Sequence, residues 1–168
     1  MGDVFKEQLV TKKRTFEDNM LFFLIILAAC MLLFLVIPLL GNFFLIGAAL
    51  VIYGAYWLLQ RLNIEYEYIL TNDELDIDII MSKSKRKKLL TVSVKNFEIM
   101  AHINDDNYAH EFRGFDKVLD YSSREIKDNT YIAMFNYNNQ KVKMIFEPNE
   151  EILKGIFQYI PRKLHIKK

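Results

Sequence analysis

The stretch Glu65–Leu90, EYEYILTNDELDIDIIMSKSKRKKLL, decides the fold of most of the chain. Apolar residues alternate with acidic ones in two runs, Tyr66–Leu70 and Leu75–Ile79, and the turn-forming Thr71–Asp73 separates them. Alternation with a period of two is typical of strands that bury one face, and a short polar link between two such runs predicts an antiparallel hairpin. Four acidic residues are expected on its outer face: Glu65, Glu67, Asp76 and Asp78.

A cluster of basic residues follows this hairpin directly. Five of the six positions in Lys83–Lys88, which we call the basic segment, are Lys or Arg: Lys83, Lys85, Arg86, Lys87 and Lys88. We expect the chain to turn back near Lys83 or Ser84, so that Asp76 and Asp78 pair with residues beyond the lysines and do not neutralise them. The basic segment is then either a surface that binds anionic groups or a solvated tip that blunts edge pairing.

Short strand patterns continue beyond the basic segment and end in a helix. Five more strands are expected, over Lys88–Val94, Phe97–Ala101, Lys117–Tyr121, Tyr131–Tyr137 and Lys141–Phe146. Apolar residues then recur with a helical period, which predicts a C-terminal helix over residues 149–160. Seven short strands followed by one helix resemble the pleckstrin-homology-like (PH-like) fold. This resemblance implies a mainly-β domain of seven antiparallel strands in a partly open barrel, with the helix capping one end.

The N-terminal part of the chain has a different composition. Asn19–Gln60 contains no charged residue. As one helix this segment would be roughly 60 Å long, about twice the hydrocarbon thickness of a bilayer. The stretch PLLGN at Pro38–Asn42 predicts a helix break. We therefore expect an α-helical transmembrane hairpin over residues 19–60, with helices over 20–37 and 43–59.

The basic residues predict the orientation of this hairpin. Four of them precede the first helix, Arg61 follows the second, and the connecting turn contains none. The positive-inside rule then predicts a multi-pass protein of the plasma membrane with both termini in the cytoplasm. Thr15–Asp18 has the form of a capping box, which predicts that the first helix begins there. The four preceding residues are Lys6, Lys12, Lys13 and Arg14.

Two groups of residues in the predicted hairpin have candidate roles. Aromatic residues near the inner end of the second helix are expected to form an interfacial anchor: Tyr53, Tyr56 and Trp57. Small residues in the second helix recur at a spacing of seven, as Gly47 and Gly54, and predict a packing face against Ala28 and Ala29 in the first. Contact with lipid is an equally good interpretation of any one of these small residues.

At the level of residues, the chain resembles a family of small bacterial membrane proteins of unknown function. The matching stretches are EYEYILTNDELDID at Glu65–Asp78, KRKKLLTV at Lys85–Val92, FEPNE at Phe146–Glu150 and PRK at Pro161–Lys163. The resemblance implies two N-terminal transmembrane helices, a bacterial PH-like cytoplasmic domain and a place in the inner membrane. It implies no activity.

The most enzyme-like stretch is AHINDDNYAHEF, residues 101–112. Its His102 and His110, with three carboxylates, are metal-ligand types, but a spacing of eight fits no known ligand motif. A polar surface loop explains the stretch better. The chain has no Gly-rich phosphate loop and no GxSxG nucleophile elbow, and Cys30 is its only cysteine. We therefore expect no catalytic residue, no metal and no cofactor.

These patterns favour a non-catalytic binding or scaffolding module that is anchored in the membrane. Its cytoplasmic domain, residues 61–168, would contact anionic headgroups of the inner leaflet or a protein partner through Arg61 and the basic segment. One alternative is an accessory subunit of a larger membrane complex, or a homo-oligomer, assembled through the transmembrane helices. A less favoured alternative is a metal-dependent hydrolase built on His102 and His110.

Two further points concern partners and the N-terminal segment. A net charge of +1 and an acidic outer face argue against nucleic acid as a partner. Residues 1–18 are expected in the cytoplasm. They form an interfacial helix, a flexible tail or a strand that docks on the domain, and the sequence does not distinguish among these.

Overall fold

The fold is described from a computed structural model, which defines residues 4–83 and 85–166. The chain divides into two compact units. The helical unit comprises Arg14–Ile64 and Met81–Lys85, and the β unit comprises residues 4–13, Glu65–Ile80 and 86–166. Each unit is described by itself.

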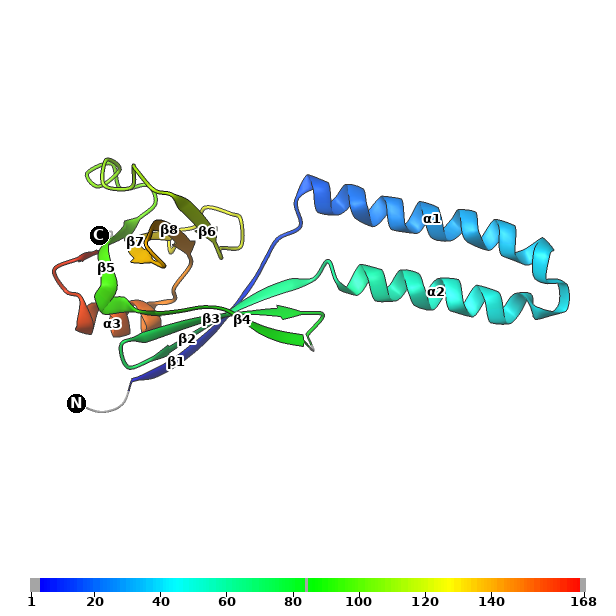
Figure 1. The fold of residues 1–168 in the computed structure, drawn as a ribbon, viewed down its shortest axis with the longest axis horizontal. Helices are drawn as coiled ribbons and strands as arrows, with labels where there is room; N and C mark the ends of the chain where they lie inside the picture. Colours follow the sequence, from blue (N-terminus) through cyan, green and yellow to red (C-terminus); the bar gives the residue numbers. More distant parts are fainter. Residues whose placement is uncertain (1–3, 84, 167–168) are drawn as a thin grey trace. The chain divides into compact units, whose positions relative to one another are not determined.

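The helical unit contains two helices that pack against each other. Helix α1 (Phe16–Leu40) is followed by the short 3₁₀ turn η1 (Gly41–Phe43) and by helix α2 (Phe44–Gln60). The helices lie side by side and run in opposite directions (Figure 1). Thr15 caps α1, and its side chain and that of Asp18 each bond the other's backbone N–H, which confirms the predicted capping box. Gly41, with a φ of 50°, supplies the left-handed conformation needed at the reversal.

Within the stretch Pro38–Asn42, where the sequence predicted a break, the chain reverses at Gly41 and Asn42 and not at Pro38. Helix α1 continues through Pro38 to Leu40, because a proline in the last turn removes only one backbone hydrogen bond there. Helical structure then passes through η1 into α2. By length and composition, Phe16–Gln60 is one joined candidate membrane-crossing helical segment among the described residues, where the sequence predicted two helices with a non-helical break between them. No side chain in either helix is buried, although nearly all are apolar.

The first sheet of the β unit has the strand order β1-β2-β3-β4. Its strands are β1 (Phe5–Thr11), β2 (Ile64–Thr71), β3 (Glu74–Met81) and β4 (Lys85–Ser93). Strand β1 pairs antiparallel with β2, from Phe5 opposite Thr71 to Thr11 opposite Glu65. The N-terminal segment is therefore an edge strand of the sheet, one of the three possibilities that the sequence left open.

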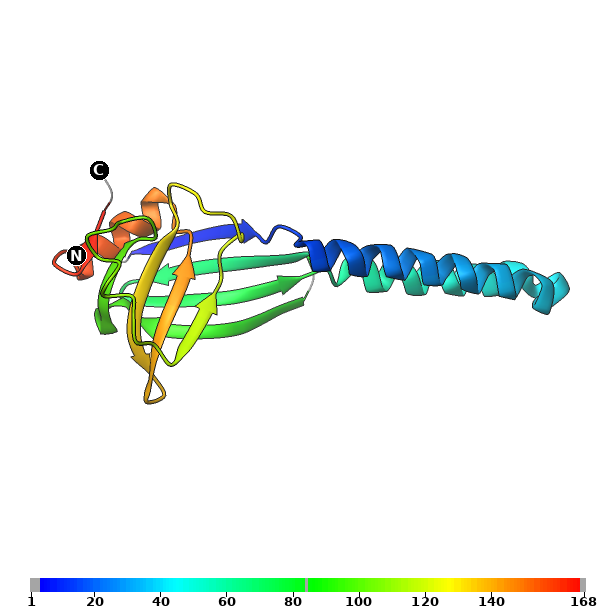
Figure 2. The ribbon, with the colours of Figure 1, turned by 90° about the horizontal axis from the view of Figure 1, so that it is seen from above.

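The second sheet has the order β6-β8-β7-β5-β9. Its strands are β5 (Phe97–His102), β6 (Lys117–Asp120), β7 (Tyr131–Tyr137), β8 (Gln140–Phe146) and β9 (Leu164–His165). A 3₁₀ turn, η2 (Val94–Asn96), leads into β5. The described residues thus form nine strands in two sheets (Figure 2), where the sequence predicted seven antiparallel ones. Two pairs, β6–β8 and β5–β9, are parallel.

The core lies where the two sheets and the C-terminal helix α3 (Glu150–Tyr159) meet. Asn149 caps α3 by accepting a hydrogen bond from the Ile152 N–H at 2.8 Å. Gly155 lets the helix approach the first sheet closely, because a Cβ there would lie 2.6 Å from Leu70 Cδ2. Large side chains from every layer are fully buried: Tyr68, Leu70, Leu75, Ile77, Phe97, Met100, Phe135, Met144, Phe146, Ile152 and Ile156.

A smaller core lies around the loop between β5 and β6. Phe112 packs with Ala101, Ile132 and Met134 in this second apolar cluster. Tyr108, also in the loop, stacks on His165 with ring centroids 3.9 Å apart. The loop is therefore packed against the β unit through Tyr108 and Phe112.

Candidate functional site

The turn between β3 and β4 is built against the end of α2. Ser82 and Lys83 both have a φ of 54°, a left-handed conformation that is uncommon outside glycine. The Ser82 hydroxyl donates to the Gln60 carbonyl at 2.7 Å, and its N–H donates to the Asn63 carbonyl at 3.1 Å. These two bonds fix the turn to the C-terminal end of α2. The predicted turn position at Lys83 agrees with this, and Ser84 lies outside the described residues.

Next to this turn is a basic pocket, which we call the turn pocket. It has a volume of about 300 Å³ and is lined by Trp57, Gln60, Arg61, Met81, Ser82 and Lys85. The Arg61 guanidinium lies over the Trp57 ring, 3.6 Å from its centroid. The lining contains no carboxylate. Within residues 4–83 and 85–166, Arg61 and Lys85 form no ion pair.

Arg14 carries a further positive charge at this end of the helical unit. Its guanidinium donates to Asn63 Oδ1 at 2.9 Å, and the Asn63 carbonyl holds Ser82. Asn63 therefore connects the residue that precedes the α1 cap to the turn. The sequence alone indicates no role for Asn63, Gln60 or Ser82, because single uncharged polar residues at or beyond the end of an element carry no spacing signal.

Two residues of the basic segment, Arg86 and Lys88, are ion-paired. The Arg86 guanidinium lies 2.6 Å from a Glu67 carboxylate oxygen, and Lys88 Nζ lies 2.9 Å from Asp76. The expectation that Asp76 would not neutralise a lysine is therefore wrong. Asp76 also accepts a hydrogen bond from the Thr91 hydroxyl, so its side chain is held between two positions of β4. The hydrogen bond between Lys88 and Asp76 raises the pKa of Lys88.

Two of the acidic residues expected on an exposed outer face are buried. Glu67 is 1% exposed and Asp78 is 6% exposed, so neither carboxylate lies on an open outer face of the sheet. Glu67 Oε2 and Asp78 Oδ1 have no hydrogen-bond partner among the described residues. Burial raises the pKa of Glu67, the interaction with the neighbouring Glu7 carboxyl raises it further, and Arg86 opposes both effects.

The other predicted site residues occupy separate places on α1 and α2. Tyr53, Tyr56 and Trp57 are exposed. Gly47 packs closely on α1, where a Cβ atom on it would collide with the side chains of Val36 and Leu40. Gly54 makes no such contact, since a Cβ atom placed on it would have no neighbouring atom within 4 Å. Ala28 and Ala29 face Val51, Ala55 and Leu58 across a hollow of about 340 Å³. The interfacial-anchor and packing roles of these residues remain predictions.

The two histidines of the enzyme-like stretch do not form one site. His102 is buried in the β unit, where its Nδ1 accepts from the Asn104 N–H at 3.1 Å. That bond places the ring proton on Nε2, 3.3 Å from the Lys127 carbonyl. His110 is exposed beside Glu111. No group of three or more His, Cys, Asp or Glu side chains in the described chain is arranged to hold a metal ion.

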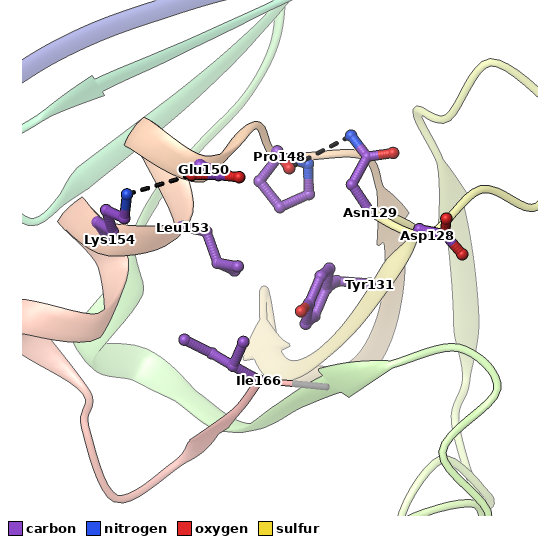
Figure 3. A pocket seen from close by; sticks show the side chains of 8 residues that line it. All are labelled: Asp128, Asn129, Tyr131, Pro148, Glu150, Leu153, Lys154 and Ile166. Carbon is purple, nitrogen blue, oxygen red and sulfur yellow. Dashed lines mark hydrogen bonds and ion pairs between the residues drawn. The ribbon is translucent and has the colours of Figure 1, made fainter. Parts of the chain in front are cut away.

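A second pocket lies in the β unit, at the start of α3 (Figure 3). It has a volume of about 510 Å³, and Tyr131, Pro148, Leu153 and Ile166 provide its apolar surface. Three of the charged and polar side chains that line it have partners: Lys154 pairs with Glu150, and Asn129 bonds the Pro148 carbonyl. This pocket offers space for an apolar group, and its lining brings no catalytic pair together.

The FEPNE stretch at Phe146–Glu150 has a structural role. The buried Glu147 carboxylate accepts hydrogen bonds from the Ser123 N–H at 2.9 Å and the Ser123 hydroxyl at 2.7 Å, and it pairs with Lys127 at 3.0 Å. Gln8 of β1 donates to the Glu147 carbonyl and accepts from the Asn149 N–H. This network ties β1, a loop and α3 together. The FEPNE residues are thus committed to the fold, whereas the turn pocket presents two basic side chains that form no ion pair with any described residue.

A comparison with known protein families identifies the family to which this chain belongs. Residues 2–166 match the family described as a bacterial PH-like domain (DUF6106). The chain belongs to this family. No curated protein and no solved structure matches it. Membership supports the PH-like reading of the β unit, and the apolar helical segment supports association with a membrane. The family description names no ligand, and the role of the turn pocket has to be argued from its own residues.

Proposed function

We propose that this PH-like protein is a membrane-anchored, non-catalytic binding or scaffolding module, whose basic turn contacts the inner-leaflet surface. The observation that carries the proposal is the turn pocket, where unpaired basic side chains adjoin the end of an apolar helical segment. The pocket and the segment belong to the same compact unit. A positive surface beside a membrane helix is suited to anionic headgroups, since each Lys or Arg near such a surface contributes about 1 kcal/mol.

The lengths of the two helices support a hairpin that crosses the membrane twice. The 25 residues of α1 and the 17 residues of α2 correspond to about 37 Å and 26 Å, against a hydrocarbon core of about 30 Å. Their backbone polar groups are satisfied within the helices, as a bilayer requires. Large exposed side chains such as Phe23, Phe34 and Leu45 find an apolar environment only if lipid or another helix covers them.

The distribution of charge supports a cytoplasmic β unit. Arg14, Arg61, Lys83 and Lys85 lie at one end of the helical unit, whereas η1 at the other end has no charged residue. Under the positive-inside rule, this distribution supports a topology with both termini in the cytoplasm and η1 outside. Membership of a PH-like family supports a binding role and no chemistry.

Membrane extraction and cysteine labelling test this arrangement. The protein should stay in the membrane fraction through a carbonate wash and leave it only with detergent. In a Cys30→Ala background, Asn42→Cys in η1 should react with a membrane-impermeant maleimide in intact spheroplasts. The matched variant Lys83→Cys should react only after lysis.

Each part of the proposal has its own contrary result. Release by carbonate would show that the helical segment is not an integral anchor. Labelling of Lys83→Cys in intact spheroplasts would place the basic turn outside and overturn the proposed contact with the inner leaflet. Protection of Asn42→Cys in intact spheroplasts would exclude a hairpin that crosses the membrane twice.

A further inference from the structure

We propose that the turn pocket is a specific binding site for a phosphate group, with a phospholipid headgroup as its source. This inference rests on the proposed function only in taking the membrane as the source. It goes beyond general attraction to an anionic surface, because it assigns one enclosed site with named ligands. Those ligands are the Arg61 guanidinium and the Lys85 ammonium group.

The charge of the pocket selects an anion. Arg61 and Lys85 both line it, no carboxylate does, and neither cation is ion-paired within the described chain. Two uncompensated cations that line one concave surface concentrate positive potential there. By contrast, Arg86 and Lys88 on the same strand already have carboxylate partners, and they lie outside the pocket.

The arrangement of Arg61 selects a phosphate in particular. Its guanidinium lies over the Trp57 ring at 3.6 Å, so the ring supports one face and leaves the N–H edge to bind a ligand. A planar fork held in this way matches two oxygens of one phosphate group. Lysine supplies a point charge that completes the neutralisation.

The pocket is held in shape before any ligand binds. Ser82 donates two hydrogen bonds to the end of α2, at 2.7 Å and 3.1 Å, and these position the turn that leads to Lys85. Because the turn is already bonded to the helix end, binding requires little ordering of the backbone. Met81 and Trp57 add apolar surface, which suits the glycerol carbons next to a lipid phosphate. The volume of about 300 Å³ is at the lower end of small-molecule sites.

The chain provides its own reporter for this site. Trp57 is the only tryptophan, it lines the pocket and it contacts Arg61. Full-length protein in a neutral detergent should therefore show a saturable change in tryptophan fluorescence on titration with dihexanoyl phosphatidylglycerol at constant ionic strength. Octanoate, which presents a carboxylate on an acyl chain, should produce a much weaker response.

A matched pair of variants separates the pocket from general charge. Lys85→Gln should weaken binding of the short-chain lipid about tenfold, the loss expected for one charge-assisted hydrogen bond. Lys87→Gln removes the same charge two residues further along β4 and outside the pocket, and it should change binding by less than about twofold. An unchanged emission spectrum for unliganded Lys85→Gln would show that the variant keeps the pocket intact.

A second titration with glycerol 3-phosphate distinguishes the sources of the phosphate. Binding of the lipid at least tenfold tighter than glycerol 3-phosphate supports a headgroup site, whereas equal binding supports a site for phosphate esters in general. The proposal is overturned if neither ligand saturates, if octanoate binds as tightly, or if Lys85→Gln and Lys87→Gln have equal effects. None of these results depends on the extraction and labelling experiments, so the anchor and the pocket can fail separately.

Discussion

The run of four basic residues on β4 divides into two groups by ion pairing. Among the residues that the structure describes, Arg86 and Lys88 are paired with acidic residues, whereas Lys85 and Lys87 are not. Arg86 and Lys88 are held by Glu67 and Asp76, at 2.6 Å and 2.9 Å. Lys85 and Lys87 form no ion pair with any described residue. Alternate side chains of a strand point to opposite faces, and the paired residues share a face with the acids of β2 and β3.

The comparison shows that a cluster of charge in the sequence overstates the charge that is free to bind a ligand. Five basic residues follow each other in the basic segment, but two of them serve the sheet itself. The other three, Lys83, Lys85 and Lys87, are exposed. Any contact with an anionic surface should depend on these three, and the stability of the β unit should depend on Arg86.

The largest expected effect is on contact with the membrane surface. In nanodiscs of anionic lipid, we expect the amides of Met81–Lys88 to be protected from hydrogen exchange in full-length protein. The triple variant Lys83→Gln, Lys85→Gln and Lys87→Gln should lower this protection by up to about a hundredfold, from about 1 kcal/mol for each lysine. Hydrogen exchange measured by mass spectrometry provides the comparison.

Zwitterionic nanodiscs and the variant Lys88→Gln are the controls for that experiment. Lys88 is equally exposed but already paired with Asp76, so its replacement should leave the protection intact. Equal loss of protection in Lys88→Gln would mean that the division of the basic segment has no bearing on membrane contact. Protection that persists in zwitterionic discs would exclude headgroup charge as its cause.

The second expected effect concerns the stability of the β unit. Arg86→Ala leaves the Glu67 carboxylate buried without its cation, which should lower the free energy of unfolding by about 2 kcal/mol. Lys87→Ala should change it by no more than about 0.5 kcal/mol, as is usual for an exposed side chain without partners. Urea denaturation of the full-length protein in neutral detergent measures both. Equal losses in the two variants would contradict the division into paired and unpaired residues.

Local patterns predicted most elements of the fold. Period-two alternation located β2 and β3, short strand patterns located β7 and β8, and the capping box at Thr15 and the helical period after Asn149 marked the starts of α1 and α3. The pairing of β1 with β2 could not be read in the same way, because its partner is more than 50 residues away. A fragment beginning after Leu62 would therefore lack an edge strand of its own sheet.

The candidate site was predicted only in part, for a related reason. Arg61 and the basic segment are visible as charges, and Trp57 as an aromatic residue near a helix end. The contact between Arg61 and Trp57 depends on the helical spacing of four residues. Two other contacts depend on how segments distant in the sequence meet in the fold. These are the hydrogen bonds of Ser82 and the ion pair of Arg86 with Glu67, which reaches across the intervening strand β3. Charge alone does not encode those contacts.

The smallest expected effect is a pH dependence of stability that arises at the paired end of the basic segment. The raised pKa of Glu67 means that the folded chain takes up a proton there more readily than the unfolded chain. Its contribution to stability is present below the unfolded pKa of about 4.3 and is lost as the pH rises through the folded value. Three charged groups bear on Glu67: Glu7 on β1, Asp78 on β3 and Arg86 on β4.

Comparison of the wild type with Glu67→Gln isolates this effect from every other pH-dependent contribution that the two proteins share. Between pH 5 and pH 7 the wild type should lose more stability than Glu67→Gln as the pH rises, in urea denaturation at matched ionic strength. The pKa of Asp73 is lowered, chiefly by its hydrogen bond from Ser93. Asp73 therefore stabilises the fold as the pH rises, but its effect changes only below about pH 5. Identical pH profiles for the two proteins would mean that Arg86 offsets the burial of Glu67 completely. Arg86 would then be committed to the sheet at every pH in this range, and the three unpaired lysines would be the part of the basic segment free to bind.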